Sequence, residues 1–105
     1  MAQLLAGKSA AITGAVTGIG RAIALEYLRQ GASVAVNFFT DDKSAEQFKT
    51  LQAEAPEGAK LIGVPGDITK QETGIKLVKE AVEKFGKLDV FVSNAGVCQF
   101  ADFLT

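Results

Sequence analysis

Four short apolar runs, separated by stretches with helical spacing, constrain the fold of this chain more than any other feature. Each run is five or six residues long and almost continuously apolar, which is typical of strands buried on both faces of a sheet. We predict strands at Ser9–Thr13, Ser33–Asn37, Lys60–Val64 and Leu88–Ser93.

Two helices are predicted between the first three runs. The first extends from about Gly18 to Gln30 and ends at Gly31, a residue favoured at helix C-termini. The second, Asp42–Glu54, begins at an Asp-rich cap and is stopped by Pro56 and Gly58. The apolar stripe of the first helix consists of Ile23, Ala24, Tyr27 and Leu28.

A third helix is predicted before the last run. Thr69 and Glu72 have the spacing of a capping box, and Gly86 closes the helix. The apolar residues that repeat at helical spacing are Ile75, Val78, Val82 and Phe85. The alternation of strands and helices predicts an α/β fold with a Rossmann-like, doubly wound parallel sheet of strand order 3-2-1-4.

Three glycines follow the first strand and open the first helix, the context of a dinucleotide-binding loop. Gly14 permits a tight turn, Gly18 lets the backbone approach a pyrophosphate, and Gly20 allows the helix to pack closely on the sheet. The helix N-terminus offers unpaired N–H groups to phosphates. The alternative is a purely structural turn, because tight strand-to-helix turns also select glycine.

The composition excludes several classes of protein. The 105 residues carry a net charge of -1, which argues against a nucleic-acid partner or an anionic membrane surface. No apolar run approaches the roughly 20 residues of a membrane span, and the first residues lack the pattern of a signal peptide. The length suits one domain, residues 1–105.

The numbers of cysteines and histidines limit the kinds of catalytic or metal site that the chain can form and the cellular compartment that it suits. The only cysteine, Cys98, cannot form an internal disulfide, so a reducing, cytoplasmic location fits best. The sequence contains no histidine, which excludes a Ser-His-Asp triad and a histidine-ligated metal site within this chain. We expect no metal site.

Three separated motifs resemble the short-chain dehydrogenase/reductase family. "TGAVTGIG" (Thr13–Gly20) matches the family's TGxxxGxG, and "GDIT" (Gly66–Thr69) follows the third strand. "SNAG" (Ser93–Gly96) ends the fourth strand, where the family has NNAG. Within the family the sequence looks most like sugar dehydrogenases. The resemblance implies a dinucleotide cofactor, NAD or NADP, and hydride transfer with a sugar or another secondary alcohol or the matching carbonyl.

The resemblance also implies roles for individual residues. Those that would line the pyrophosphate are Thr13, Gly14, Gly18, Ile19 and Gly20. Asp67 and Ile68 would face the adenine, with Asp67 accepting from its exocyclic amine. Beside the nicotinamide ribose would lie Asn94, Ala95 and Gly96. Two structural alternatives stand: Asp67 as a helix-entry residue that supports Thr69, and Asn94 as a strand-end residue that bonds local backbone.

The end of the second strand carries neither of the residues that usually select the cofactor. An acidic residue there accepts from the ribose 2′-hydroxyl, and a basic residue nearby takes the 2′-phosphate of NADP. Asn37 and Thr40 are neutral and suit either form, and Thr17, a further candidate cofactor contact, is not basic. The absence of a carboxylate at position 37 favours NADP or dual use, although Asp41 and Asp42 weaken this preference; their default role is a helix cap.

The catalytic residues of this family are missing from the sequence. The family uses a tyrosine with a lysine four residues later, but the only tyrosine is Tyr27 and Gly31 stands four positions on. We therefore expect the cofactor-binding, N-terminal part of a dehydrogenase, C-terminally incomplete relative to the family, in which residues 101–105 start a fourth helix. The alternative is a truncated, non-catalytic protein that binds a nucleotide or a partner.

The same resemblance predicts self-association. The family places a fifth strand beside the fourth, and without it the fourth strand is an open edge and the third helix covers its sheet face almost alone. Open edges and exposed apolar faces promote association between chains.

Overall fold

The computed structural model of the chain describes residues 5–16 and 18–92. Its elements in chain order are β1 (Ser9–Ile12), α1 (Gly18–Arg29), β2 (Ser33–Phe38), α2 (Asp42–Glu54), β3 (Leu61–Pro65), α3 (Gln71–Phe85) and β4 (Val90–Val92). The four strands are parallel and lie in the order β3-β2-β1-β4. The predicted fold class and strand order are confirmed.

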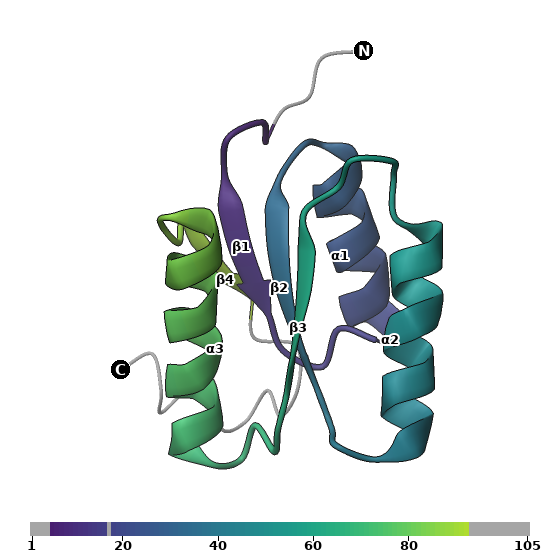
Figure 1. Ribbon diagram of the computed structural model, residues 1–105, viewed down its shortest axis with the longest axis vertical. Helices are drawn as coiled ribbons and strands as arrows, with labels where there is room; N and C mark the ends of the chain where they lie inside the picture. The colour runs from purple at the N-terminus through teal and green to yellow at the C-terminus, as the bar shows by residue number, and fades with distance from the viewer. Residues whose placement is uncertain (1–4, 17, 93–105) are drawn as a thin grey trace.

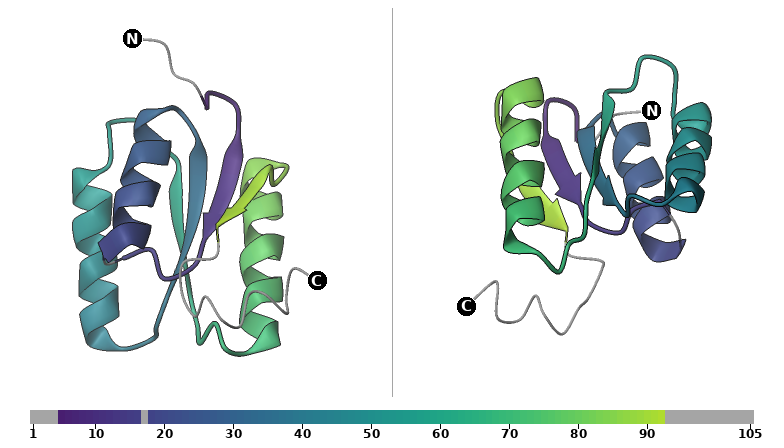
Figure 2. Two further views of the ribbon diagram at one scale, coloured as in Figure 1. Left: turned by 180° about the vertical axis from the view of Figure 1, so that it is seen from behind. Right: turned by 60° about the horizontal axis from the view of Figure 1, so that its bottom comes forward.

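The sheet lies between two layers of helices, with α1 and α2 on one face and α3 on the other (Figure 1). The views from behind and from below show the same arrangement (Figure 2). From β1 through β2 to β3 the chain moves in one direction across the sheet, and from β3 to β4 it returns past both central strands. Because such crossovers are right-handed, the reversal of direction puts α3 on the opposite face.

Each face of the sheet has its own apolar core. On the α1 and α2 side, Val34, Val36 and Phe38 of β2 pack with Leu28 and Leu51. The core on the α3 side is smaller and consists of Ala11, Ala35, Val64, Leu77 and Ala81. The alternation of side chains along β2 therefore supplies both cores, as expected for a central strand of a parallel sheet.

Burial on both faces holds for two of the four strands only. All four residues of β1 are buried, and so is β2 from Val34 onward. In β3 only Val64 is buried, and the three residues of β4 are half-buried. The expectation of full burial is wrong for β3 and β4 because each pairs with a single neighbouring strand in the described sheet.

The predicted ends of the helices are confirmed at two places and wrong at one. The Asp41 carboxylate accepts from the backbone N–H of Ser44 at 2.7 Å and caps α2. Hydrogen bonding by the Ser44 side chain, and then by its backbone N–H, lowers the pKa of Asp41. Gly86 ends α3 with φ of 85°. The capping box is not formed: Lys70 is the N-cap of α3 and has no side-chain cap bond. Thr69 donates to Asp67 instead, as described below.

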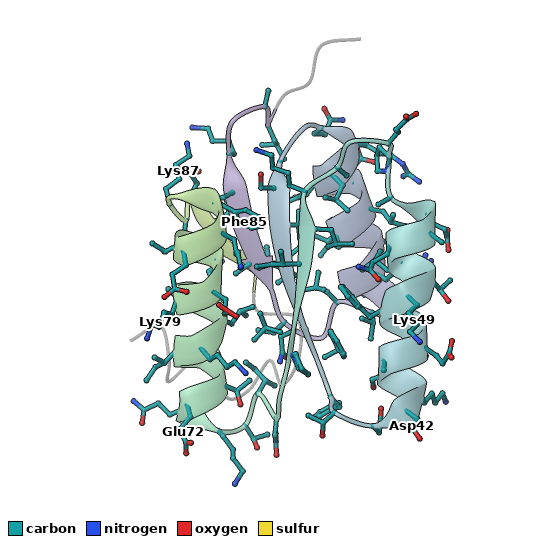
Figure 3. All side chains as sticks on the ribbon, in the orientation of Figure 1. Asp42, Lys49, Glu72, Lys79, Phe85 and Lys87 are labelled. Carbon is teal, nitrogen blue, oxygen red and sulfur yellow. The ribbon has the colours of Figure 1, made fainter. Side chains whose placement is uncertain are left out.

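The face that α3 turns to the sheet differs from the apolar repeat in its sequence. Leu77 and Ala81 are fully buried against the sheet, with Phe85 packed beside them. Ile75 and Val82 are 60% and 42% exposed. Figure 3 shows Lys79 on the outer side of α3, away from the sheet. Helix α3 thus has apolar residues on two faces, and the sheet covers one of them.

The short strand β4 is fixed to β1 at its amino end by Asp89. The Asp89 carboxylate accepts from the backbone N–H of Ser9 at 2.9 Å, and the Asp89 N–H donates to the Ser9 carbonyl at 2.9 Å. The bond from Ser9 lowers the pKa of the Asp89 carboxyl. These contacts set the register in which Ile12 lies opposite Val92. None of the described helices is long and apolar enough to cross a membrane.

Candidate dinucleotide-binding site

The loops that carry the candidate residues meet at one edge of the sheet. Parallel strands present their carboxyl ends together, so the segments after β1, β2 and β3 all leave the sheet at the lower edge in Figure 1. Asp42 and Glu72, in the first turns of α2 and α3, lie at this same edge in Figure 3. The amino ends of these helices therefore point to the region where the loops gather.

The direction of the chain reverses between β1 and β4. Helix α1 leaves β1 toward one face of the sheet, whereas α3 arrives at β4 along the other face. In open α/β sheets, ligands bind outside the carboxyl ends of the strands at such a topological switch point. The glycine-rich segment begins at this point, because the N–H of Thr13, its first residue, donates to the Val92 carbonyl of β4 at 3.1 Å.

The glycine-rich segment has the conformation expected of a tight strand-to-helix turn. Gly14 and Gly18 have φ of 59° and 56°, in the left-handed region that favours glycine. Thr13 is fully buried, and Gly20 is buried in the first turn of α1. Ile19, by contrast, is 74% exposed.

The start of α1 is open to a ligand. A Cβ atom built on Gly18 would meet no atom within 4 Å, so the backbone there is accessible from outside. The first turn of α1 contains no acidic residue that would oppose a phosphate. The first N–H groups of a helix lack partners within the helix and carry partial positive charge. The residues present therefore fit a pyrophosphate at this position.

The loop after β3 holds Asp67 in a defined orientation. Its Oδ1 accepts from the N–H of Thr69 at 2.9 Å and from the Thr69 hydroxyl at 2.6 Å, and the N–H of Lys70 donates to the Asp67 carbonyl at 3.0 Å. The two bonds from Thr69, and to a lesser extent the charge of Lys70, lower the pKa of Asp67. Asp67 thus supports Thr69 at the entry to α3, the structural alternative for this residue, while it is also exposed at the carboxyl edge.

The end of β2 differs from the sequence interpretation. Asn37 is 2% exposed, and its Nδ2 donates to the carbonyls of Val64 and Gly66 at 3.2 and 3.1 Å. Both amide hydrogens are engaged within the protein, so the Asn37 amide has no free donor for the ribose, and the predicted contact is replaced by bonds to the loop after β3. Thr40 is exposed and keeps that candidate role.

The aromatic residues at this end of β2 have different environments. Phe38 is 8% exposed and stacks on Phe48 of α2, with ring centroids 4.9 Å apart. Phe39 is 52% exposed at the carboxyl edge. Phe38 therefore belongs to the core.

The remaining candidates fall into two groups. Ile68 follows Asp67 and is half-buried. The candidates that lie outside the described residues are Thr17, Asn94, Ala95 and Gly96. Sequence analysis named the pairing of Asp67 with Thr69 as an alternative, and the structure shows it. Between residues 5 and 92, Thr17 apart, no group of three metal-ligating side chains comes together.

The comparisons with known proteins agree with this geometry. Residues 8–105 match the family described as short chain dehydrogenase. The chain belongs to this family. It is 53% identical over 105 residues to L-rhamnose-1-dehydrogenase of Scheffersomyces stipitis, and the match covers 99% of this chain and 41% of that protein. It is 46% identical over 102 residues to L-rhamnose 1-dehydrogenase (NAD(P)(+)) of Sphingomonas sp., with 97% and 39% covered.

A solved structure has a similar fold. L-sorbose reductase from Gluconobacter frateurii, crystallised with NADPH and L-sorbose, superimposes with a TM-score of 0.76 and 31% identity. The match covers 91% of this chain and 36% of the reductase. The chain spans about two fifths of the length of the two dehydrogenases it matches.

Proposed function

We propose that this chain forms the dinucleotide-binding part of an NAD(P)-dependent oxidoreductase that acts on a sugar or another secondary alcohol, or on the matching carbonyl. The observation that carries the proposal is the position of the glycine-rich loop. It joins β1 to the open start of α1 at the point where the chain direction reverses, which is where dinucleotides bind in sheets of this kind. The bound cofactor supplies the hydride donor or acceptor.

We propose that each loop at this edge contacts a different part of the cofactor. The proposed contacts with the pyrophosphate are Gly14, Thr17, Gly18, Ile19 and Gly20. The fully buried Thr13 holds the start of this turn through the bond from its N–H to the Val92 carbonyl. Asp67 and Ile68 face the adenine, and Thr40 lies near the ribose. Asn94, Ala95 and Gly96 are proposed to lie beside the nicotinamide ribose. The exposure of Ile19 and Asp67 at the same edge supports this division.

The proposed substrate is a sugar with a secondary alcohol, because the relatives named above act on L-rhamnose and L-sorbose. We propose a cytoplasmic location, consistent with a single cysteine.

Turnover of L-rhamnose by the full natural protein, followed by the absorbance of the reduced cofactor, separates the proposed oxidoreductase activity from a non-catalytic nucleotide- or partner-binding role. Cofactor binding without turnover of any sugar would favour the second role.

We expect the protein to bind NADP at least as tightly as NAD. Thr40 is neutral, and Asn37 offers no carboxylate that would repel a 2′-phosphate. Isothermal titration calorimetry with each cofactor measures the preference. Binding of NAD at least about tenfold tighter than NADP, a difference of roughly 1.4 kcal/mol, would overturn the preference.

We also propose that the 105-residue chain self-associates through α3. Ile75 and Val82 are exposed on this helix, and Ile75 and Val78 line an apolar depression together with Gly74. Exposed apolar patches of this kind promote association. In size-exclusion chromatography with light scattering, the chain is expected to give a concentration-dependent mass above 11.0 kDa, and Ile75→Lys with Val82→Lys is expected to restore the monomer. A wild-type chain that stays monomeric at all concentrations contradicts this proposal.

A further inference from the structure

Asn37 is a buried polar residue between the two loops of the candidate site. It is the fifth of six residues of β2 and is 2% exposed. Because side chains alternate along a strand, it lies on the same face as Ala35, the face that α3 covers. A carboxamide in such a place needs partners for its two donor hydrogens.

The Asn37 side chain bonds to carbonyls at the end of β3 and at the start of the loop that follows it, Gly66–Thr69, which we call the adenine loop because it is proposed to hold the adenine. Its Nδ2 donates to the carbonyl of Val64 at 3.2 Å and to the carbonyl of Gly66 at 3.1 Å. The N–H of Gly66 donates in turn to the carbonyl of Phe38 at 2.9 Å. Gly66 is therefore held through both its N–H and its carbonyl by consecutive residues of β2.

The backbone of the same residue holds the glycine-rich loop. The Asn37 carbonyl accepts from the N–H of Ala15 at 3.2 Å. Ala15 is fully buried and lies next to Gly14 in the turn after β1. Asn37 thus bonds to the segment proposed to hold the pyrophosphate and to the segment proposed to hold the adenine.

The bond to Gly66 bears directly on Asp67, the next residue. Asp67 is fixed on its other side by Thr69, and the adenine loop leaves no room at Gly66, where a Cβ would lie 2.8 Å from the methyl carbon of Thr73. The direction in which Asp67 leaves the sheet therefore follows from the orientation of the Gly66 peptide, which the Asn37 amide sets.

We propose that Asn37 is a positioning residue for the adenine end of the cofactor site. Its side-chain amide fixes Gly66 and thereby the position of Asp67. Its backbone carbonyl bonds to Ala15 and so also fixes the glycine-rich loop relative to Asp67. The inference rests on the proposed function, and it gives Asn37 a role through other residues in place of contact with the ribose.

The test uses 5′-ADP, which carries adenosine and two phosphates and does not depend on the 2′-phosphate. Its affinity is measured by isothermal titration calorimetry on the full natural protein, and the unfolding midpoint by scanning calorimetry. Asn37→Ala is expected to weaken 5′-ADP binding about tenfold, because the loop then lacks the bonds to the Val64 and Gly66 carbonyls and binding must restore its order. Val34→Ala is the matched control, since it removes a buried side chain from the other end of β2.

The outcomes distinguish positioning from general stability. Both variants are expected to lower the unfolding midpoint, and only Asn37→Ala is expected to weaken 5′-ADP. Unchanged affinity in Asn37→Ala, or an equal loss in Val34→Ala, overturns the inference. If Asn37→Ala does not fold, Asn37→Ser replaces it in the same comparison. A wild-type protein that binds neither 5′-ADP nor NAD nor NADP would refute the proposed function itself.

Discussion

Gly18→Asp is expected to weaken NADP binding roughly a hundredfold. Gly18 opens α1 with its backbone accessible, at the proposed position of the pyrophosphate. We take a separation of about 6 Å between the new carboxylate and a phosphate for the Coulomb energy. At an effective dielectric constant of about 20 the repulsion is about 3 kcal/mol, which corresponds to roughly two powers of ten in affinity. Calorimetric titration with NADP measures the loss.

Gly18→Asn provides the control of equal size. Asparagine and aspartate both tolerate the left-handed conformation that φ of 56° requires, so the two variants carry similar backbone strain. They differ only in charge, and aspartate near a helix N-terminus does not lower helix stability. NADP affinities in both variants that stay close to the wild-type value would show that no phosphate binds at this helix start.

Leu77→Ala is expected to destabilise the 105-residue chain by about 3 kcal/mol. Leu77 is fully buried between α3 and the sheet, in the smaller of the two cores. Removing a buried leucine side chain costs about 2–5 kcal/mol, because apolar burial is lost and a cavity remains. For a domain of this size the melting temperature falls by roughly 10–20 °C. Thermal unfolding followed by circular dichroism measures the change.

Ile75→Ala is the matched control on the same helix. Ile75 lies two residues earlier and is 60% exposed, so in dilute samples in which the chain is monomeric its truncation is expected to change stability by less than about 0.5 kcal/mol. The two variants distinguish the face of α3 that packs from the face that the apolar repeat suggests. A larger loss in Ile75→Ala than in Leu77→Ala would mean that α3 packs on the sheet through the other face.

Much of the fold was predictable because the signals are local. Helix α2 begins at Asp42 and ends at Glu54, the predicted bounds, since a capping carboxylate at Asp41 and a stop at Pro56 mark its ends. The strand order follows from the alternation of strands and helices together with right-handed crossovers. The capping box was wrong because Thr69 has a competing acceptor in Asp67.

The candidate site was predictable in part. Glycines at positions 14 and 18 indicate a tight turn with positive φ values, and the structure has positive φ at both residues. The environment of Asn37 was not predictable, because its partners Val64 and Gly66 lie 27 and 29 residues away. A neutral residue at the end of a strand looks the same in sequence whether it faces a ribose or a neighbouring loop.

The sequence by itself determined the elements, their order and the place of the glycine-rich turn, since capping residues, glycine spacing and apolar period act over a few residues. Only the tertiary structure decided which face of α3 packs and where the Asn37 amide points. Helix α3 carries apolar side chains on two faces, and the sheet selects Leu77 and Ala81 because the crossover from β3 to β4 fixes how the helix lies. Contacts between segments distant in sequence also decided that β3 and β4, as edge strands, stay partly exposed.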